Sequence, residues 1–190
     1  QKRNLRQYNT TIGANVLGYV AEVNRSNLEK DNYYSQGDII GKQGVELSYE
    51  KYLRGKKGIK FIQKDRFNRD IGSFNDGLND INSIAGNDLT ITIDSELQKY
   101  GELLMSNKKG AIIAIEPSSG ELLTLVSAPS YNPNLLVGRE RSKNYFELYQ
   151  DSIYKPLLDK GLLSTFPAGS PFKVIVGLIA LEEKVINEKS

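Results

Sequence analysis

Residues 110–126, GAIIAIEPSSGELLTLV, consist of two apolar runs separated by the polar stretch 116–120. This connection contains a proline and a glycine and is short enough to close a β-hairpin. Both runs are apolar at nearly every position, which is typical of strands that are buried on both faces. We therefore predict two antiparallel strands with helices on both sides of the sheet, in an α+β protein.

The segment before this hairpin shows two local patterns. Residues 89–93 alternate between apolar and polar side chains, which predicts a strand. Residues 95–105 have a helical pattern, and either Asp94 or Ser95 is expected to cap that helix. Ser95 with Gln98 fits a capping box. The apolar stripe of the predicted helix consists of Leu97, Tyr100 and Leu104.

The chain after the hairpin contains one more strongly apolar segment. Residues 129–165 are rich in polar and turn-forming residues, and we expect a long, loop-rich connection there. Residues 174–181 are apolar on nearly every side of a helix, which predicts a helix buried in the centre of a domain. We expect this helix to cover one face of the predicted sheet.

The first 90 residues differ in composition from the rest of the chain. Gly, Asn, Asp and Tyr are frequent there, and residues 68–86 are expected to be an exposed loop. Residues 46–53 are predicted to form a helix that ends before Gly55. This region cannot bury much apolar surface per residue, so we place a domain boundary between residues 88 and 89. Short strands between turns are predicted at residues 16–20, 38–41 and 59–62.

Composition excludes several kinds of site. The 190 residues have a net charge of +2, which gives no reason to expect a nucleic-acid partner. Cysteine and histidine are absent, so a disulfide framework, a Ser-His-Asp triad and ordinary zinc sites are excluded, and we expect neither a cofactor nor a metal. The longest apolar run has eight residues, against about 20 for a membrane span. No signal peptide is visible at Gln1.

Residues 166–173, FPAGSPFK, place Ser170 one helical turn before Lys173. In such a pair the hydroxyl is a candidate nucleophile and the amine a candidate base, with no need for a histidine. Only this pair has a flexible glycine before it, a proline at the expected helix start and a long apolar helix after it. The same spacing occurs without that context at Ser48–Lys51, Ser106–Lys109 and Ser152–Lys155.

Lys173 is unusual for its expected position. The first turn of a helix favours acidic residues because the helix dipole is positive there. Burial of the helix would also desolvate the amine. Both effects lower the pKa of Lys173 and favour the neutral amine, which is the form that accepts a proton. The alternative is a lysine whose ammonium group reaches solvent at a helix end.

Three further groups of residues have simple structural explanations. Glu116 and Glu121 flank the hairpin turn, where solvated turn residues fit better than a catalytic carboxylate pair. The basic loop 54–58 is better explained as a solvated turn than as a binding site for anionic lipid or glycan. The tyrosines Tyr33, Tyr34, Tyr49 and Tyr52 are better explained by packing than by sugar stacking.

Taken together, these motifs resemble those of the class B penicillin-binding proteins, and within them the cell-elongation type. The hairpin and the following SAPSYNPN, residues 127–134, resemble the start of the family's transpeptidase domain. PAGSPFK, residues 167–173, resembles the family's active-site motif Pro-Pro-Gly-Ser-x-Phe-Lys, with Ala168 in place of the second proline. GDIIGKQGVE, residues 37–46, with parts of 49–55, resembles the family's pedestal domain.

The resemblance implies a fold and residue roles. Residues 1–88 would form an extended, β-rich pedestal domain of the dimerisation type. Residues 89–190 would form the N-terminal part of a transpeptidase domain, an α/β sandwich with an antiparallel sheet. Ser170 would be the acylated nucleophile, and its N–H would be one donor of the oxyanion hole. Lys173 would be the base that takes the proton of Ser170.

The resemblance also implies substrates and partners. The substrate would be a peptidoglycan stem peptide ending in D-Ala-D-Ala, whose acyl group passes to an amine of a neighbouring strand. β-Lactams would acylate the same serine. A membrane glycosyltransferase of the elongation machinery would be a partner. The implied location is the inner membrane, with an N-terminal anchor and a periplasmic catalytic part.

One departure from the family pattern limits this expectation. The family also has a Ser-x-Asn and a Lys-Thr-Gly motif beyond the active-site serine, and neither follows Ser170 before Ser190. We therefore expect the chain to be a fragment that does not catalyse transpeptidation alone. The alternative is a non-catalytic interaction module, or a penicillin-sensor-like protein, that docks a membrane glycosyltransferase through its first 90 residues.

Overall fold

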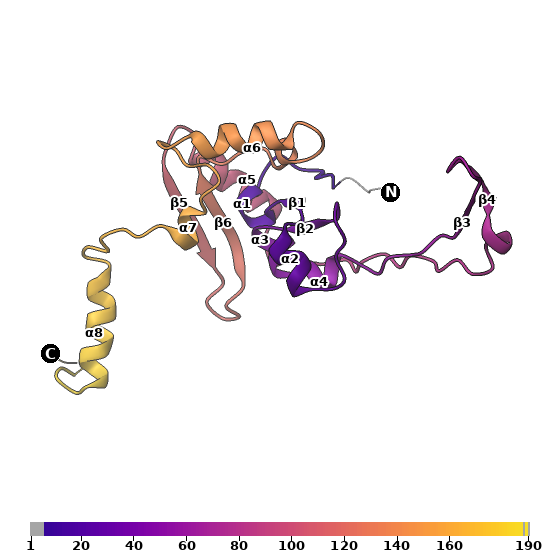
Figure 1. Ribbon diagram of the computed structural model, residues 1–190. Helices are drawn as coiled ribbons and strands as arrows, with labels where there is room; N and C mark the ends of the chain where they lie inside the picture. The colour runs from indigo at the N-terminus through magenta and orange to yellow at the C-terminus, as the bar shows by residue number, and fades with distance from the viewer. Residues whose placement is uncertain (1–5, 188, 190) are drawn as a thin grey trace.

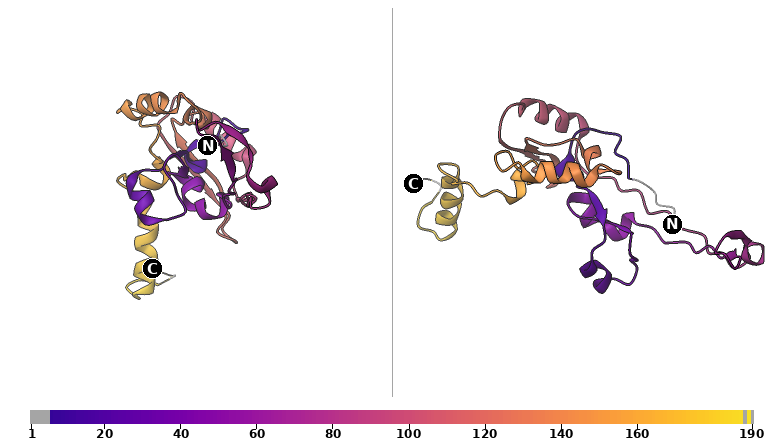
Figure 2. Two further views of the ribbon diagram at one scale, coloured as in Figure 1. Left: turned by 45° about the vertical axis from the view of Figure 1, so that its right-hand side comes forward. Right: turned by 45° about the horizontal axis from the view of Figure 1, so that its top comes forward.

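The structure is a computed structural model that describes residues 6–187 and 189. The first five residues of the predicted pedestal and two residues near the C-terminus therefore lie outside it. Figure 1 shows a central body from which an arm, residues 55–86, and a C-terminal helix extend in different directions. The right-hand view of Figure 2 shows both extensions clear of the body as well. The fold is α+β, as predicted, and the described residues form three two-stranded antiparallel sheets.

The predicted hairpin is confirmed. Strand β5, Gly110–Ile115, pairs antiparallel with β6, Leu122–Ala128, and the register places Ile112 opposite Val126. The register shifts between Ala114 and Ile115, next to the turn. In Figure 1 the hairpin lies on the left of the body, and the N-terminal elements lie to its right.

Helices cover both faces of the hairpin, as predicted, but the second helix is a different one. Helix α5, Ser95–Leu104, packs against β6, and the short helix α7, Lys160–Leu163, packs against both strands. A side chain at Gly101 of α5 would clash with Val126, and one at Gly161 of α7 would approach Leu125. Because Val126 and Leu125 are neighbours on one strand, the two helices lie on opposite faces.

The start of α5 differs in detail from the sequence prediction. Asp94 is the cap, and its carboxylate accepts hydrogen bonds from the N–H groups of Glu96 and Leu97, both at 2.9 Å. The capping box of Ser95 and Gln98 is wrong because the Gln98 side chain binds the sheet instead. Residues 89–93 are not a strand; a backbone bond from Asp94 attaches the end of this segment to β6.

The N-terminal part of the body is built from short elements. Strands β1 and β2 pair antiparallel, with Val20 opposite Gly41. The strand predicted at 38–41 is confirmed. Of residues 16–20, the first two end helix α1 and only Val20 belongs to a strand, and the helix predicted at 46–53 is broken at Tyr49. The elements are α1 Ala14–Leu17, β1 Val20–Glu22, α2 Arg25–Lys30, β2 Ile39–Gly41, α3 Gly44–Ser48 and α4 Glu50–Leu53.

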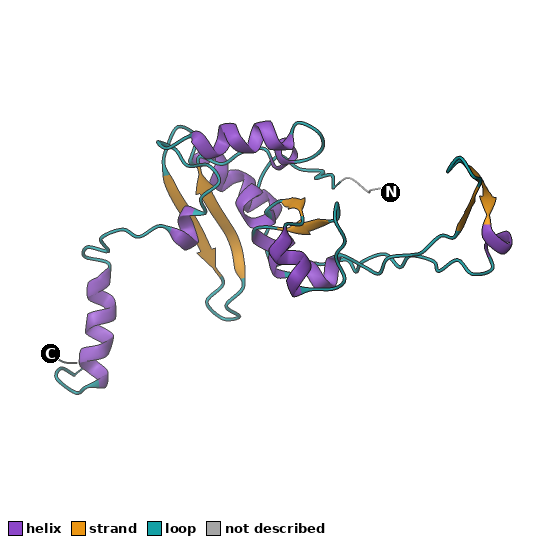
Figure 3. Cartoon of the chain, in the orientation of Figure 1, coloured by secondary structure: helices purple, strands orange, loops and turns teal. Residues whose placement is uncertain are grey.

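The arm consists of two antiparallel legs of the chain that extend from the body and return to it. Its two legs are joined by isolated bridges, Lys56 with Ile84 and Ile59 with Ile81. Figure 3 shows that most of it is loop, with strands only near its end. Within the predicted exposed loop 68–86, four residues form a strand. The elements are β3 Ile62–Lys64, β4 Asp70–Ser73 and the 3₁₀ turn η1 Phe74–Gly77.

The connection 129–165 is more structured than predicted. It contains the 3₁₀ turn η2, Pro133–Leu136, and helix α6, Arg141–Gln150, in addition to α7. The core cluster of the body combines Ala14 with Tyr131 and Leu136. Residues before and after the predicted boundary at 88/89 therefore share one apolar cluster, and the boundary itself stays a prediction. The partly buried residues packed on this cluster are Tyr19, Tyr145, Leu148 and Leu157.

Helix α8, Phe172–Glu182, is formed as predicted, but its expected burial is wrong. None of its residues is buried, and it stands apart from the body in Figures 1 and 2. Helix α7 packs on one face of the sheet instead, but it leaves Ile113 and Ile115 of β5 45% and 55% exposed, so β5 is not buried on both faces as predicted. No helix in the described part of the chain is long and apolar enough to cross a membrane.

Candidate active-site segment

Ser170 lies at the entrance to α8, between an extended segment and the helix. Residues 164–169 have no helix or strand, and Gly169 has φ 60°, a backbone conformation that favours glycine. Pro171 immediately precedes the first residue of α8 and already has helical dihedral angles. Proline is tolerated at this position because an N–H at a helix start has no intrahelical hydrogen-bond partner, so its absence removes no bond.

The backbone at the start of α8 places Ser170 and Lys173 one helical turn apart, on the same side. The N–H of Phe172 donates to the Gly169 carbonyl at 3.1 Å, and that of Lys173 donates to the Ser170 carbonyl at 3.0 Å. Residues three positions apart lie on the same side of a helix. A base on this side can take a proton from the serine hydroxyl if solvent is excluded.

Both side chains are exposed in this structure. The predicted burial of Lys173 is therefore not present in this structure. Between the two side chains the described structure contains no hydrogen bond. The roles of Ser170 and Lys173 stay predictions, supported by local geometry and by the sequence motif.

The other three Ser-x-x-Lys matches lie in different surroundings. Ser48 ends α3 and Lys51 belongs to α4, so a break separates them. Ser106 follows the end of α5, and Ser152 lies in a turn after α6. Only the match at Ser170 precedes a helix of eleven residues. The structure thus separates the four matches in the way that the sequence context did.

The weaker candidates are engaged in local structure. Ser118 donates to Glu116 at 2.7 Å and Ser119 to Glu121 at 3.0 Å, as expected for turn residues. In the basic loop, Arg54 forms an ion pair with Asp31 at 2.8 Å. The rings of Tyr33 and Tyr34 pack edge to face with centroids 5.2 Å apart. In the described residues no cluster of three or more potential metal ligands occurs.

Several polar residues are buried although their burial was not predicted from the sequence. Lys160 is 3% exposed, and its ammonium donates to the Lys155 carbonyl at 3.0 Å. Burial lowers the pKa of Lys160, and the nearby charge of Lys109 lowers it further. Asn15, 4% exposed, and Gln98, 2% exposed, also have buried amides. Asn, Gln and Lys are usually surface residues, so sequence alone gave no signal for their burial.

Two family models match this chain. The penicillin-binding protein dimerisation domain matches residues 1–91, and the penicillin-binding protein transpeptidase domain matches residues 110–190. The chain belongs to the penicillin-binding proteins.

Its relatives narrow the class further. The chain is 35% identical to the peptidoglycan D,D-transpeptidase MrdA of Acinetobacter baumannii, over 92% of this chain and 25% of that protein. It is 32% identical to MrdA of Escherichia coli strain K12, over 100% of this chain and 30% of that protein. Among solved structures, PBP2 in its complex with MreC from Helicobacter pylori is 37% identical, with a TM-score of 0.78, over 98% of this chain and 34% of that one.

These comparisons confirm the resemblance that the sequence motifs indicated. The chain spans only 25% to 30% of the length of the two MrdA relatives. The activity that the names of these relatives state is that of proteins of which this chain matches only that share.

Proposed function

We propose that the full-length protein is a peptidoglycan D,D-transpeptidase that crosslinks stem peptides in cell-wall elongation. Ser170 is its nucleophile and Lys173 its general base. The observation that carries this proposal is the Ser170–Lys173 pair at the start of α8, downstream of the β5–β6 hairpin. The match of the transpeptidase family model across this region supports it.

The proposed reaction has two steps. Lys173 accepts the proton of the Ser170 hydroxyl while Oγ attacks the carbonyl between the two D-Ala residues of a stem peptide. The amide bond breaks, and the terminal D-Ala leaves with a proton. An amine of a neighbouring strand then attacks the acyl ester and releases Ser170. The Ser170 N–H is one donor to the oxyanion in both steps.

The same serine is the site at which β-lactams acylate the protein. The chain alone is expected to be inactive, because no Ser-x-Asn or Lys-Thr-Gly motif follows Ser170 and because α8 is exposed. We place the full-length protein at the inner membrane, with its catalytic part in the periplasm. A membrane glycosyltransferase of the elongation machinery is the proposed partner. The solved complex of a PBP2 relative with MreC, and the peptidoglycan synthase complex that coordinates polymerization and crosslinking, support assembly with other proteins.

Mass spectrometry of the intact full-length protein with penicillin tests the nucleophile. We expect one covalent adduct, which Ser170→Ala abolishes. Ser106→Ala is the matched control, because Ser106 also begins a Ser-x-x-Lys sequence. An adduct that survives in Ser170→Ala would refute the assignment of the nucleophile.

The second candidate function is a non-catalytic interaction module. The exposed arm favours it, because large apolar side chains such as Phe67, 62% exposed, and Leu78, 82% exposed, lie along the arm. The coding sequence beyond Ser190 discriminates between the two functions. If it contains Ser-x-Asn and Lys-Thr-Gly, it supports the enzyme; if both are absent, the interaction module remains.

A further inference from the structure

Four successive backbone carbonyls, those of residues 155–158, each accept a hydrogen bond from a side chain. Lys160 Nζ donates to the Lys155 carbonyl at 3.0 Å. Asn15 Nδ2 donates to the Pro156 carbonyl, and Gln43 Nε2 donates to the Leu157 carbonyl, both at 3.2 Å. Ser127 Oγ donates to the Leu158 carbonyl at 3.0 Å. We call residues 155–158 the junction segment.

Three of the four donors come from distant parts of the chain, whereas Lys160 lies close to the junction segment in sequence. Asn15 belongs to α1, and Gln43 precedes α3, so both lie in the part of the chain that matches the dimerisation domain. Ser127 belongs to β6, which lies in the transpeptidase match. The junction segment is therefore held from both domains at once.

The side chains that hold the junction segment are themselves fixed. Asn15 is 4% exposed, and its Oδ1 accepts a hydrogen bond from Ser130 Oγ at 3.2 Å, which sets the orientation of its amide. Ser127 Oγ accepts a hydrogen bond from the Lys160 N–H at 2.9 Å while it donates to Leu158. Asn15 and Ser127 therefore each bind a second group besides the junction segment, which helps to fix the position of that segment.

The junction segment leads directly towards Ser170. Helix α7 follows it, is capped by Asp159, and packs on the sheet. From the end of α7, Leu163, only the unstructured residues 164–169 separate it from Ser170. A fully extended chain advances about 3.5 Å per residue, so Ser170 must lie within about 24 Å of Leu163. The junction segment and α7 thus anchor the start of the connection that carries Ser170.

We propose that Asn15 and Gln43 are positioning residues for acylation at Ser170, and that they act through the junction segment. This inference rests on the proposed function, because it assigns a role to residues remote from the reacting atoms. Through these two side-chain amides, the N-terminal part of the protein holds the junction segment, which precedes α7 and Ser170. Movement of α1 or of the loop before α3 is transmitted to α7 by these two bonds.

The test uses the full-length protein and near-isosteric changes that remove the donors, Asn15→Leu and Gln43→Met. The first-order rate of acylation by a fluorescent penicillin at saturation is measured, together with the concentration that gives half-saturation. Amide hydrogen exchange is followed at residues 155–163. Asn144→Leu is the matched control, because Asn144 Nδ2 donates to the Leu135 carbonyl at 2.8 Å within the C-terminal part.

We expect the double variant to be acylated about tenfold more slowly, as two lost hydrogen bonds would predict, with an unchanged half-saturating concentration. Exchange at 155–163 is expected to become faster, and the control is expected to match the wild type in both measurements. Gln43→Met alone changes a half-buried residue and keeps the test available if the double variant does not fold.

Two results would overturn the inference. An unchanged acylation rate would show that the junction segment does not position Ser170, even if exchange is faster. Unchanged exchange would show that the two amides do not hold the segment. A wild-type protein that forms no adduct would refute the proposed function instead, and the exchange measurement would then still test the junction segment.

Discussion

At the scale of single residues, Gln98 shows how a polar side chain can join a helix to a sheet. It is 2% exposed, and its Nε2 donates to the Leu125 carbonyl at 3.1 Å. Its Oε1 accepts from the Leu125 N–H at 2.9 Å and from Thr124 Oγ1 at 2.6 Å. The amide therefore binds both backbone groups of Leu125, as a neighbouring strand would.

We predict that Gln98→Met lowers the free energy of unfolding by about 2–3 kcal/mol. The volume is kept, but the buried backbone groups of Leu125 lose their partner, and an unsatisfied buried group costs about 1–3 kcal/mol. Chemical denaturation measures the change. Gln63→Met on the exposed strand β3 is the control, and an equal loss in both variants would contradict the explanation.

Tyr131 presents the opposite case, a buried hydroxyl that has no hydrogen-bond partner in the described structure. Burial raises the pKa of Tyr131 to about 12 from its ordinary value of 10.0, and Tyr145 adds to the effect. As pH rises through this range, the unfolded chain releases its proton first. The folded state then holds more protons, so stability falls between pH 10.0 and about 12.

We predict that Tyr131→Phe is neutral or stabilising at pH 7, because it removes a hydroxyl that is buried without a partner. The variant is also expected to lose less stability than the wild type between pH 10.0 and about 12. Urea denaturation at several pH values measures both effects. Tyr154→Phe, on a ring that is 52% exposed, is the control. If the stability of Tyr131→Phe falls with rising pH as steeply as that of the wild type, the role of Tyr131 is contradicted.

At the scale of elements, the face of α5 that packs on the sheet is polar and small. Gln98 and Gly101 are its buried residues, whereas Leu97, Tyr100 and Leu104 of the predicted apolar stripe are at least 37% exposed. Gly101 lets α5 approach β6 closely, and the Gln98 amide forms hydrogen bonds with the backbone of β6. Helical periodicity therefore identified α5 correctly but not the face that contacts β6.

We predict that Gly101→Ala destabilises the protein by about 1–3 kcal/mol, although alanine is the better helix former by about 1 kcal/mol. The new methyl carbon would lie 2.8 Å from Val126 Cγ2, closer than packing allows. Thermal denaturation measures the change. Gly177→Ala in α8 is the matched control, because nothing lies within 4 Å of the added carbon, and it is expected to cause no loss. Val126→Ala in the Gly101→Ala background should relieve the clash.

At the scale of the whole molecule, the arm is held to the body at its root. The Arg54 guanidinium lies 3.9 Å from the centre of the Tyr33 ring, and its NH1 donates to Asp31 at 2.8 Å. Lys57 Nζ donates to the Tyr33 carbonyl at 2.6 Å. At Gly86 an added side-chain carbon would lie 1.9 Å from the Leu53 carbonyl oxygen, so the two legs meet where only glycine fits.

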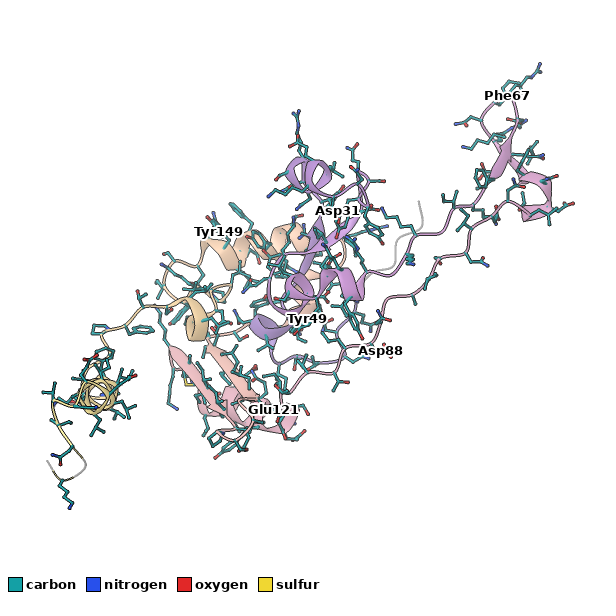
Figure 4. The ribbon with its side chains drawn as sticks, turned by 90° about the horizontal axis from the view of Figure 1, so that it is seen from below. Asp31, Tyr49, Phe67, Asp88, Glu121 and Tyr149 are labelled. Carbon is teal, nitrogen blue, oxygen red and sulfur yellow. The ribbon has the colours of Figure 1, made fainter. Side chains whose placement is uncertain are left out.

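Figure 4 shows Phe67 at the far end of the arm and Asp31 at its base. The Tyr33 ring lies beneath both Arg54 and Lys57 at the base, so it is expected to help set the direction of the arm, together with the ion pair of Lys57 with Asp38. Cation–π contacts of this kind contribute about 0.5–1 kcal/mol at exposed sites. The bonds of Lys57 to the Tyr33 carbonyl and to Asp38 remain when the ring is removed, so a change in the arm reports on the ring contacts.

We predict that Tyr33→Ala broadens the distribution of arm directions. The chain has no cysteine, so Asn68→Cys near the arm tip and Glu121→Cys at the hairpin turn can be spin-labelled specifically. Pulsed electron resonance then measures the distance distribution between the two labels. Tyr49→Ala, at a residue that is 48% exposed, is the control. Distance distributions of equal width in Tyr33→Ala and the wild type would contradict the role of Tyr33.

The sequence by itself determined the β5–β6 hairpin, helices α5 and α8, and the Ser170–Lys173 candidate. These features depend on local patterns: apolar runs, turn residues and the Gly169–Pro171 helix start. A local pattern is sufficient because its cause lies within a few residues of its effect.

Only the tertiary structure decided which surfaces meet. It placed α7 rather than α8 on the second face of the hairpin, turned Gln98 and Gly101 towards β6, and brought Asn15 and Gln43 to the junction segment. The last two residues bind carbonyls more than 110 positions away in the chain. Such contacts depend on shape and on unsatisfied backbone groups, and neither is encoded in a local pattern of side chains.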